Sequence, residues 1–319
     1  MRKESPNMNP VSNRPNGQFN EALRRAQVFL TARQHPDGGW GYAAGTQSFT
    51  EPTCYALLAL KNVTPTHQAT TGKGNENSSA AKALAWFEKQ QTAAGAVRFM
   101  DDKMNPDNWG TILASFTLYR VGIGPELQKA CLNYLLGARG NRIKQEVAAP
   151  LKLDGDLQGW SWAINTASWV EPTAYAMLAL KAQGLRHHER VKTGEAYLLD
   201  RACYDGGWNY GNKEVLNVKL EPMPTNTAFA LLALQDYQRD HEVIQKSLAW
   251  FESELATHQS TLTLALGALC LQIYDRPFEH LLHSLVARQE ADGGWRGNVH
   301  LTAVAALALM AEQQNVFRV

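Results

Sequence analysis

Two glutamates occupy the same position in a repeated motif. A carboxyl group at that position can have either a structural or a catalytic role. The motif reads EPTCYALLAL at residues 51–60 and EPTAYAMLAL at residues 171–180. A proline in the first turn, with a carboxylate beside the positive end of the helix dipole, is typical of a helix start. The catalytic interpretation makes Glu171, with Glu51 as a second candidate, a general acid, because burial in an apolar cavity raises a carboxyl pKa and keeps the group protonated. One proton donor suffices, so two copies favour the structural interpretation.

The motif belongs to a longer internal repeat that must position these side chains. Related segments read TNTAFALLAL at residues 225–234 and HLTAVAALAL at residues 300–309. Glycine-tryptophan turns recur ahead of three of the four segments: DGGWGY at 37–42, DGGWNYG at 205–211 and DGGWRG at 292–297. A looser version, DLQGWSW, precedes the remaining segment. Self-similarity of this kind indicates a repeat architecture.

The repeat alternates two kinds of helix. The four segments are apolar on nearly every side, so each is expected to be buried all round. The stretches EALRRAQVFLTARQ at 21–34 and EHLLHSLVARQ at 279–289 place apolar residues at i, i+3 and i+4 spacing among charged ones, so one face meets water. Asp-Gly-Gly ends the outer helix, because glycine tolerates the left-handed C-cap conformation.

Counting these units gives six helical hairpins. An open solenoid would leave a buried face exposed at each end, whereas a closed ring satisfies every face. The pattern therefore predicts an all-α fold, a single α6/α6 toroid over residues 19–319, without strands. Residues 1–18 are expected to form a disordered extension, and residues 64–77 a mobile one, because both are rich in Pro, Gly and polar residues. The outer helices are expected to begin near Phe19, Ser79, Gly124, His187, His241 and Pro277, and the inner ones near Glu51, Gly110, Glu171, Thr225, Thr261 and His300.

Composition excludes several classes of protein. The chain has 319 residues with 31 Lys+Arg against 30 Asp+Glu, and this balance argues against nucleic acid as a partner. The longest apolar stretch, residues 302–311, is half of the about 20 residues that a transmembrane helix needs. The first residues carry no apolar signal segment, and the four cysteines form no CxxC pair. We therefore expect a cytoplasmic protein without a transmembrane segment.

The turns also carry a family resemblance. QHPDGGW at 34–40 and QEADGGW at 289–295 resemble the QW repeats of squalene-hopene and oxidosqualene cyclases. The β subunits of protein prenyltransferases share the same α/α toroid. The resemblance implies an isoprenoid or other long apolar ligand in the central cavity of the ring.

The resemblance also indicates where an acid would stand. Squalene cyclases carry D-x-D-D-T-A at the start of an inner helix, where the middle Asp protonates the alkene. Aligned with WVEPTA at 169–174, the motif matches Thr173 and Ala174, and Glu171 takes the place of the proton donor. The cyclase motif itself is absent. Toroidal glycosidases instead pair two carboxylates, a role for which Glu51 and Glu171 are also candidates.

A metal site follows from the prenyltransferase resemblance. That family binds zinc through D-x-C at one inner-helix start and His at another, and Cys54-Tyr55 resembles its Cys-Tyr. If the ring closes, the first and sixth inner helices are neighbours, so Glu51, Cys54 and His300 could converge on Zn²⁺. The alternative is a buried thiol and a polar helix-start residue.

Aromatic residues complete the predicted site. An aromatic wall would suit an isoprenoid chain or stabilise a carbocation, and core packing is the alternative for each residue singly. One hypothesis is a non-standard cyclase- or prenyltransferase-like protein that binds an isoprenoid and transforms it, and the other is a catalytically silent toroid that serves as a scaffold for a protein partner. The candidate ligand-binding residues are Trp169, Tyr55, Tyr175, Phe229, Trp109 and Trp162.

Overall fold

The computed structural model describes residues 15–61, 78–100, 108–257 and 260–319. The expected extension at 64–77 and most of the one at 1–18 lie outside these ranges. The first helix begins at Pro15, so residues 15–18 belong to the ring and not to an extension.

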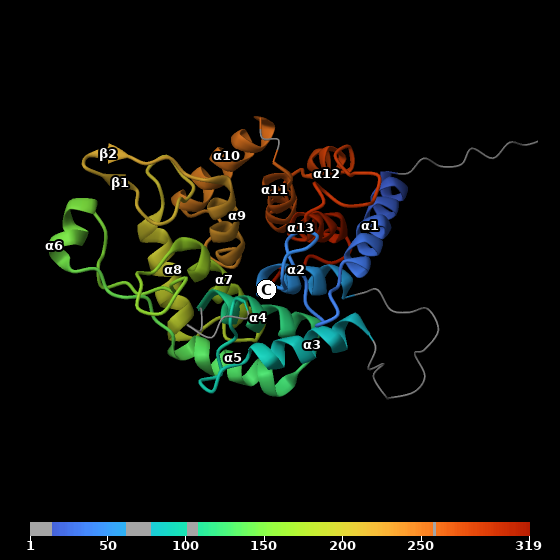
Figure 1. Cartoon of the computed structure of the whole chain (residues 1–319). Helices are drawn as coiled ribbons and strands as arrows, with labels where there is room; N and C mark the ends of the chain where they lie inside the picture. The colour runs from blue at the N-terminus through green and yellow to red at the C-terminus, as the bar shows by residue number, and fades with distance from the viewer. Residues whose placement is uncertain (1–14, 62–77, 101–107, 258–259) are drawn as a thin grey trace, which may run out of the picture.

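Six inner helices form a closed ring, each packed against the next, and the last returns to the first (Figure 1). Nearly every residue in them is buried, because alanines and leucines alternate on all sides of each helix. These inner helices are α2 (Thr50–Leu60), α4 (Asn108–Val121), α7 (Val170–Ala182), α9 (Pro224–Ala233), α11 (Thr261–Ile273) and α13 (Val299–Met310).

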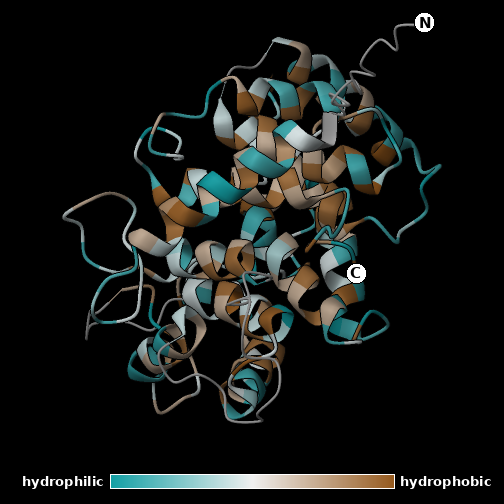
Figure 2. Cartoon of the chain, turned by 90° about the vertical axis from the view of Figure 1, so that its right-hand side faces the viewer, coloured by the Kyte–Doolittle hydropathy of each residue, from teal (hydrophilic) through white to brown (hydrophobic). Residues whose placement is uncertain are grey.

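Six outer helices surround this ring. They carry both hydrophilic and hydrophobic residues (Figure 2), and their apolar stripes pack on the inner helices. The predicted all-α toroid is confirmed. The outer helices are α1 (Pro15–Ala32), α3 (Ser79–Gln90), α5 (Pro125–Gly137), α8 (Glu189–Arg201), α10 (Glu242–Thr257) and α12 (Glu279–Val286).

The tryptophan of each turn ties an outer helix to an inner one. The indole Nε1 of Trp40 donates to the Leu30 carbonyl at 2.7 Å, and its backbone N–H donates to Thr53 Oγ1 on α2 at 2.9 Å. The same pair of bonds recurs in the turns of Trp160, Trp208 and Trp295. Both groups are buried, so each bond avoids the cost of an unpaired polar group.

Each of these turns also packs against the next outer helix. Gly38 has a φ of +98°, and a Cβ there would lie 2.2 Å from the Lys82 carbonyl oxygen on α3. Gln34 donates through Nε2 to the Gly38 carbonyl at 2.8 Å and to the Ser79 carbonyl at 2.9 Å. The Trp therefore holds each hairpin together, and the Gln and Gly join it to its neighbour.

Two small elements stand outside the ring and were not predicted. The strands β1 (Glu214–Val215) and β2 (Val218–Lys219) form an antiparallel hairpin, so the expectation of a chain without strands was wrong. Beside it lie α6 (Gln145–Ala148) and the 3₁₀ turn η1 (Ala149–Leu151). Together they project from the side of the ring (Figure 1).

Candidate functional site

The threonine of each inner-helix motif fixes which side chain faces the centre of the ring. Thr53 and Thr173 bond to the backbone of the turn outside their helices. Since successive residues are rotated by about 100°, the residue two positions earlier points to the opposite side, towards the centre. We call these residues the first-turn positions. On α2, α4, α7, α9 and α13 they are Glu51, Trp109, Glu171, Thr225 and His300.

Glu171 is the carboxyl group with the most altered acidity. Burial raises its pKa to about 8, and the negative charge of Glu51 contributes in the same direction. Among the described residues no hydrogen-bond donor reaches its carboxyl group, so no local bond favours the ionised form. The group is therefore largely protonated at neutral pH, as the catalytic interpretation requires.

Glu51 has a different environment. The hydroxyl of Tyr42 donates a short hydrogen bond to Glu51 Oε2. Burial, followed by the Glu51 charge, raises the pKa of Tyr42, so the phenol stays neutral and remains a donor. The Tyr42 carbonyl accepts from Val299 N at 2.9 Å, which attaches this loop to α13. Sequence reasoning missed Tyr42, although it directly follows the Gly-Trp-Gly of the first turn.

His300 lies beside this pair. Its ring packs on Tyr55 at a centroid distance of 4.6 Å and meets the edge of Tyr42 at 6.2 Å. Burial lowers the pKa of His300, while the charge of Glu51 opposes the change. The Nε2 atom is buried, and none of the residues that the structure describes forms a hydrogen bond with it. A neutral imidazole with a free nitrogen therefore faces the same region as the two glutamates.

The predicted zinc set does not fit. Within the ranges that the structure describes, no three His, Cys, Asp or Glu side chains are grouped so that they could hold a metal ion. Cys54 is fully buried, and burial raises the pKa of its thiol. Zinc needs the thiolate, which this environment disfavours. Among the described residues, Glu51, Cys54 and His300 therefore do not form the expected metal site.

Aromatic rings fill the ring beside the glutamates and one turn further along the inner helices. Tyr175 contacts Tyr55 at 6.3 Å, Trp109 at 5.5 Å and Phe229 at 5.5 Å between ring centroids. The exposed fractions of these four side chains are 5% or less. Four of the six residues predicted to contact a ligand therefore form a packed floor, and Glu51, Glu171 and His300 beside it are only half-buried.

Two further aromatic residues complete this floor and were not predicted. Phe317, near the end of the chain, stacks on Phe116 at 5.5 Å and meets Tyr175 edge-on at 6.0 Å. Figure 1 shows the C-terminus in the middle of the ring. No repeat pattern marks this terminal segment, so its position could not be predicted from sequence.

The other two tryptophans predicted to contact a ligand, Trp162 and Trp169, lie in different places. Trp162 is half-buried and packs on Trp109 at 4.5 Å, while the Trp109 N–H donates to the Trp162 carbonyl at 3.1 Å. Trp169 instead contacts Tyr210 edge-on at 6.2 Å, on the side of the projecting hairpin. Trp162 therefore adjoins the aromatic floor, and Trp169 does not join it.

No protein-family model matches the chain. The chain is 24% identical over 217 residues to drimenyl diphosphate synthase from Streptomyces showdoensis, a match that covers 64% of this chain and 34% of that protein. It superposes on the type II terpene cyclase MstE from Scytonema with a TM-score of 0.64 and 14% identity, covering 94% of this chain and 99% of that one. The predicted resemblance to terpene cyclases is confirmed.

Other solved structures define the limits of this resemblance. A variant of MstE in complex with its substrate, geranylgeranyl dihydroxybenzoate, matches with a TM-score of 0.62 and 15% identity, over 93% of this chain and 98% of that one. A glycosidase matches with a TM-score of 0.63 and 11% identity, over 95% of this chain and 98% of that one. At such identities the likeness shows the fold alone. The chain also spans only about a third (34%) of the length of drimenyl diphosphate synthase.

Proposed function

We propose that the chain binds an isoprenoid over the aromatic floor and cyclises it by proton transfer from Glu171. One observation carries the proposal: a carboxyl group with a pKa of about 8 stands at an inner-helix start, next to packed aromatic rings. A general acid must be protonated at the working pH, and this group is. The resemblance to terpene cyclases supports the same substrate class.

The first step is protonation of a carbon–carbon double bond. The Glu171 proton forms a C–H bond with the π electrons of the alkene, which leaves a carbocation on the substrate and a carboxylate on Glu171. Attack by a second double bond then closes a ring and moves the positive charge along the chain. Release of a proton to a base ends the sequence and restores a neutral product.

The surrounding side chains stabilise these charges. Trp109 and Trp162, whose ring centroids lie 4.5 Å apart, have faces that carry the negative quadrupole that attracts a carbocation. The charge of Glu51 raises the pKa of Glu171 and also favours a cation nearby. The hydrogen bond from Tyr42 holds the Glu51 carboxylate in one orientation. Each of these groups is placed before substrate arrives, which lowers the cost of reorganisation.

The experiment replaces the proton donor. Glu171→Gln keeps the shape of the side chain but removes the acidic proton. We expect turnover of linear isoprenoids, tested as prenyl diphosphates and prenylated aromatic compounds, to fall by at least about 100-fold. Products are measured by mass spectrometry. Glu126→Gln, on the exposed first turn of α5, is the control and should leave turnover unchanged.

Two outcomes would count against the proposal. If Glu171→Gln turns over these substrates like the wild type, Glu171 is not the acid. If the wild-type chain neither binds nor converts any of them, the silent scaffold is the better interpretation.

A glycosidase remains the second candidate because the site holds two glutamates in different environments. Glu171 has a raised pKa, while Glu51 accepts a hydrogen bond from Tyr42. An acid and a carboxylate with separated roles are the requirement for glycoside hydrolysis. Hydrolysis of aryl glycosides by the wild type, lost in both Glu171→Gln and Glu51→Gln, would establish this activity instead.

A further inference from the structure

Two glutamates flank one tryptophan around the central ring. The inner helix α4 contacts α2 on one side and α7 on the other. The first-turn positions of these helices are therefore Glu51, Trp109 and Glu171, in this order around the ring. Under the proposed function, on which this inference rests, Glu171 gives the first proton and Trp109 stabilises the cation. The reaction also needs a base that takes the last proton, and Glu51 stands on the other side of Trp109.

The carboxyl group of Glu51 has one oxygen that is held and one that is open. The Tyr42 hydroxyl donates to Oε2, whereas no residue that the structure describes donates a hydrogen bond to Oε1. Both side chains are only half-buried, so a molecule in the centre of the ring can reach them. A hydrogen bond to a carboxylate favours its ionised form, and only this form accepts a proton. Glu51 is thus an oriented base with one free oxygen.

Other groups beside Glu51 that could accept a proton are less accessible. Cys54 and Tyr55 on the same helix are 1% exposed or less, and burial raises the pKa of both, so they stay neutral. The Nε2 atom of His300 is buried. A base must come within hydrogen-bond distance of the proton that it takes. Among these neighbours, Glu51 therefore has the most open oxygen.

The interaction between the two glutamates connects the first step to the last. The negative charge of Glu51 raises the pKa of Glu171, so the two carboxyl groups are close enough to interact. This interaction is mutual. Once Glu171 has lost its proton, the two carboxylates repel each other, and the repulsion favours the return of one proton to the pair. Donation by Glu171 thereby makes Glu51 a better acceptor.

We propose that Glu51 is the base that ends the cyclisation, with Tyr42 as its positioning residue. Glu51 Oε1 takes a proton from the carbon beside the final cationic centre. The electrons of the broken C–H bond form a carbon–carbon double bond, so the product is an uncharged alkene and Glu51 becomes a carboxylic acid. Glu51 then releases this proton to water and Glu171 takes one up, which restores both groups with no net change in protons.

The experiment follows the fate of the carbocation as well as the rate of its formation. Glu51→Gln keeps the shape of the side chain but removes the proton acceptor. Glu171 still protonates the substrate in this variant, because burial is the largest cause of its raised pKa. We expect isoprenoid consumption to fall by less than about tenfold, while the ratio of the wild-type alkene to all other products falls by at least about tenfold. Isomeric alkenes and alcohols formed by water capture should replace it, as measured by mass spectrometry.

Tyr42→Phe tests the positioning role. It removes the hydrogen bond to Oε2 and leaves the carboxylate, so the product ratio should shift in the same direction as in Glu51→Gln, but by only about threefold. A merely structural role would slow consumption and leave the ratio unchanged. Tyr119→Phe, on α4 and 42% exposed, is the matched control and should form the wild-type products.

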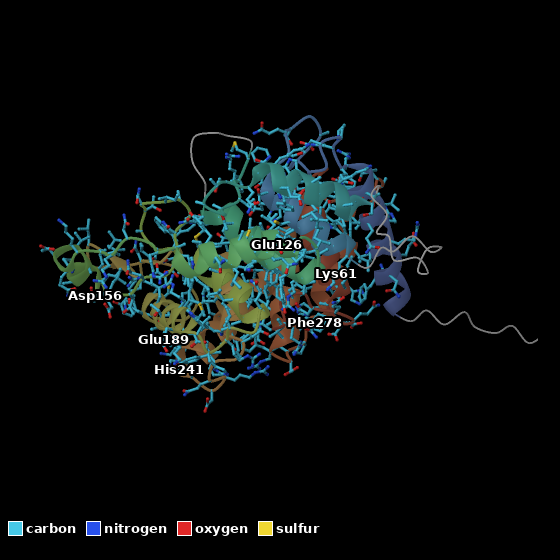
Figure 3. All side chains as sticks on the ribbon, turned by 90° about the horizontal axis from the view of Figure 1, so that it is seen from below. Lys61, Glu126, Asp156, Glu189, His241 and Phe278 are labelled. Atoms are coloured by element: carbon cyan, nitrogen blue, oxygen red, sulfur yellow. The ribbon has the colours of Figure 1, made fainter. Side chains whose placement is uncertain are left out.

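Glu126→Gln controls for the loss of a carboxyl group. Glu126, labelled in Figure 3, is exposed and follows the C-terminal end of α4, so it lies at the opposite end of the ring from Trp109. This variant should form the wild-type products at the wild-type rate.

The outcomes separate this inference from the proposed function. If Glu171→Gln stops consumption but Glu51→Gln forms the wild-type products in the wild-type ratio, Glu51 is not the base and the proposed function stands. The inference is also overturned if Glu51→Gln consumes no substrate, because Glu51 then acts in the first step, or if His300→Gln alone redirects the products. If the wild type converts no isoprenoid, both proposals fail. Should Glu51→Gln not fold, as judged by circular dichroism, an unchanged ratio in Tyr42→Phe overturns the inference.

Discussion

At the scale of single residues, the site depends on the different environments of two glutamates at equivalent positions. Glu51 and Glu171 occupy matching turns, yet only Glu51 has a hydrogen-bond donor, the Tyr42 hydroxyl. Without a donor, burial dominates at Glu171 and raises its pKa to about 8. The repeat alone could predict both glutamates but not this difference, because Tyr42 lies in a turn whose path depends on α13.

The pKa of Glu171 has a consequence for stability. The folded pKa is about 8, above the ordinary value of 4.5, so between these values the folded chain holds a proton that the unfolded chain has released. The free energy of unfolding therefore falls as pH rises through this window, and the contribution is fully present below it. Glu171→Gln lacks this dependence. Its stability relative to the wild type should rise by roughly 2 to 4 kcal/mol between about pH 5 and about pH 8.

Urea denaturation at several pH values measures this difference. Unfolding free energies of the wild type and Glu171→Gln that run parallel with pH would contradict a raised pKa. Glu126→Gln, an exposed change at the start of α5, controls for the loss of one carboxyl group and should give parallel curves.

At the scale of elements, the repeated turn explains why the ring was predictable from sequence. Its Trp and Thr bond the outer helix of a hairpin to the inner one, and its Gln and Gly contact the next hairpin, so the motif encodes packing as well as local structure. The projecting hairpin was missed for the opposite reason. Its strands have two residues each, too few for an alternating pattern, and its loop carries Leu216 where glycine or asparagine signals would be expected. Phe317 was missed because it packs through tertiary contacts outside any repeat.

The threonine of the motif can be tested directly. Thr173→Val removes the acceptor of the Trp160 backbone N–H, which is bonded at 2.9 Å in a buried setting. We expect the free energy of unfolding to fall by about 1 to 3 kcal/mol, because the amide is left without a partner. Thr31→Val, where the exposed hydroxyl bonds only to the Gln27 carbonyl, should change it by less than about 0.5 kcal/mol. Equal losses in the two variants would show that the Thr173 bond has no special role.

At the scale of the whole molecule, closure of the ring joins the first and last repeats. α13 packs on both α1 and α2, so the hairpins at the two ends of the sequence support each other. Gln289 crosses this junction and donates to the Ala22 carbonyl at 2.8 Å and the Gly293 carbonyl at 2.9 Å. Open repeat arrays can unfold from their ends, whereas a closed ring has none. Among the described residues no helix is long and apolar enough to span a bilayer.

Ring closure predicts cooperative unfolding. Far-UV circular dichroism and tryptophan fluorescence should report one coincident transition in urea. Gln289→Ala should lower the free energy of unfolding by about 1 to 2 kcal/mol by both probes, because loosening the junction weakens the whole ring. If the unfolding transition of Gln289→Ala shifts by one probe and not by the other, the end repeats unfold separately.

The first-turn positions recur on successive inner helices, so the same side chain can be placed at several points around the ring. A site built on one loop does not offer this choice. Trp109, Glu171 and Thr225 stand on consecutive inner helices, and Thr111, Thr173 and Thr227 bond in the same way to the turns outside them. Under the proposed function, a carboxyl group placed one helix further around the ring would approach the same substrate from a different direction. The direction of approach would then decide which double bond receives the proton, so rings of the same architecture would form different products.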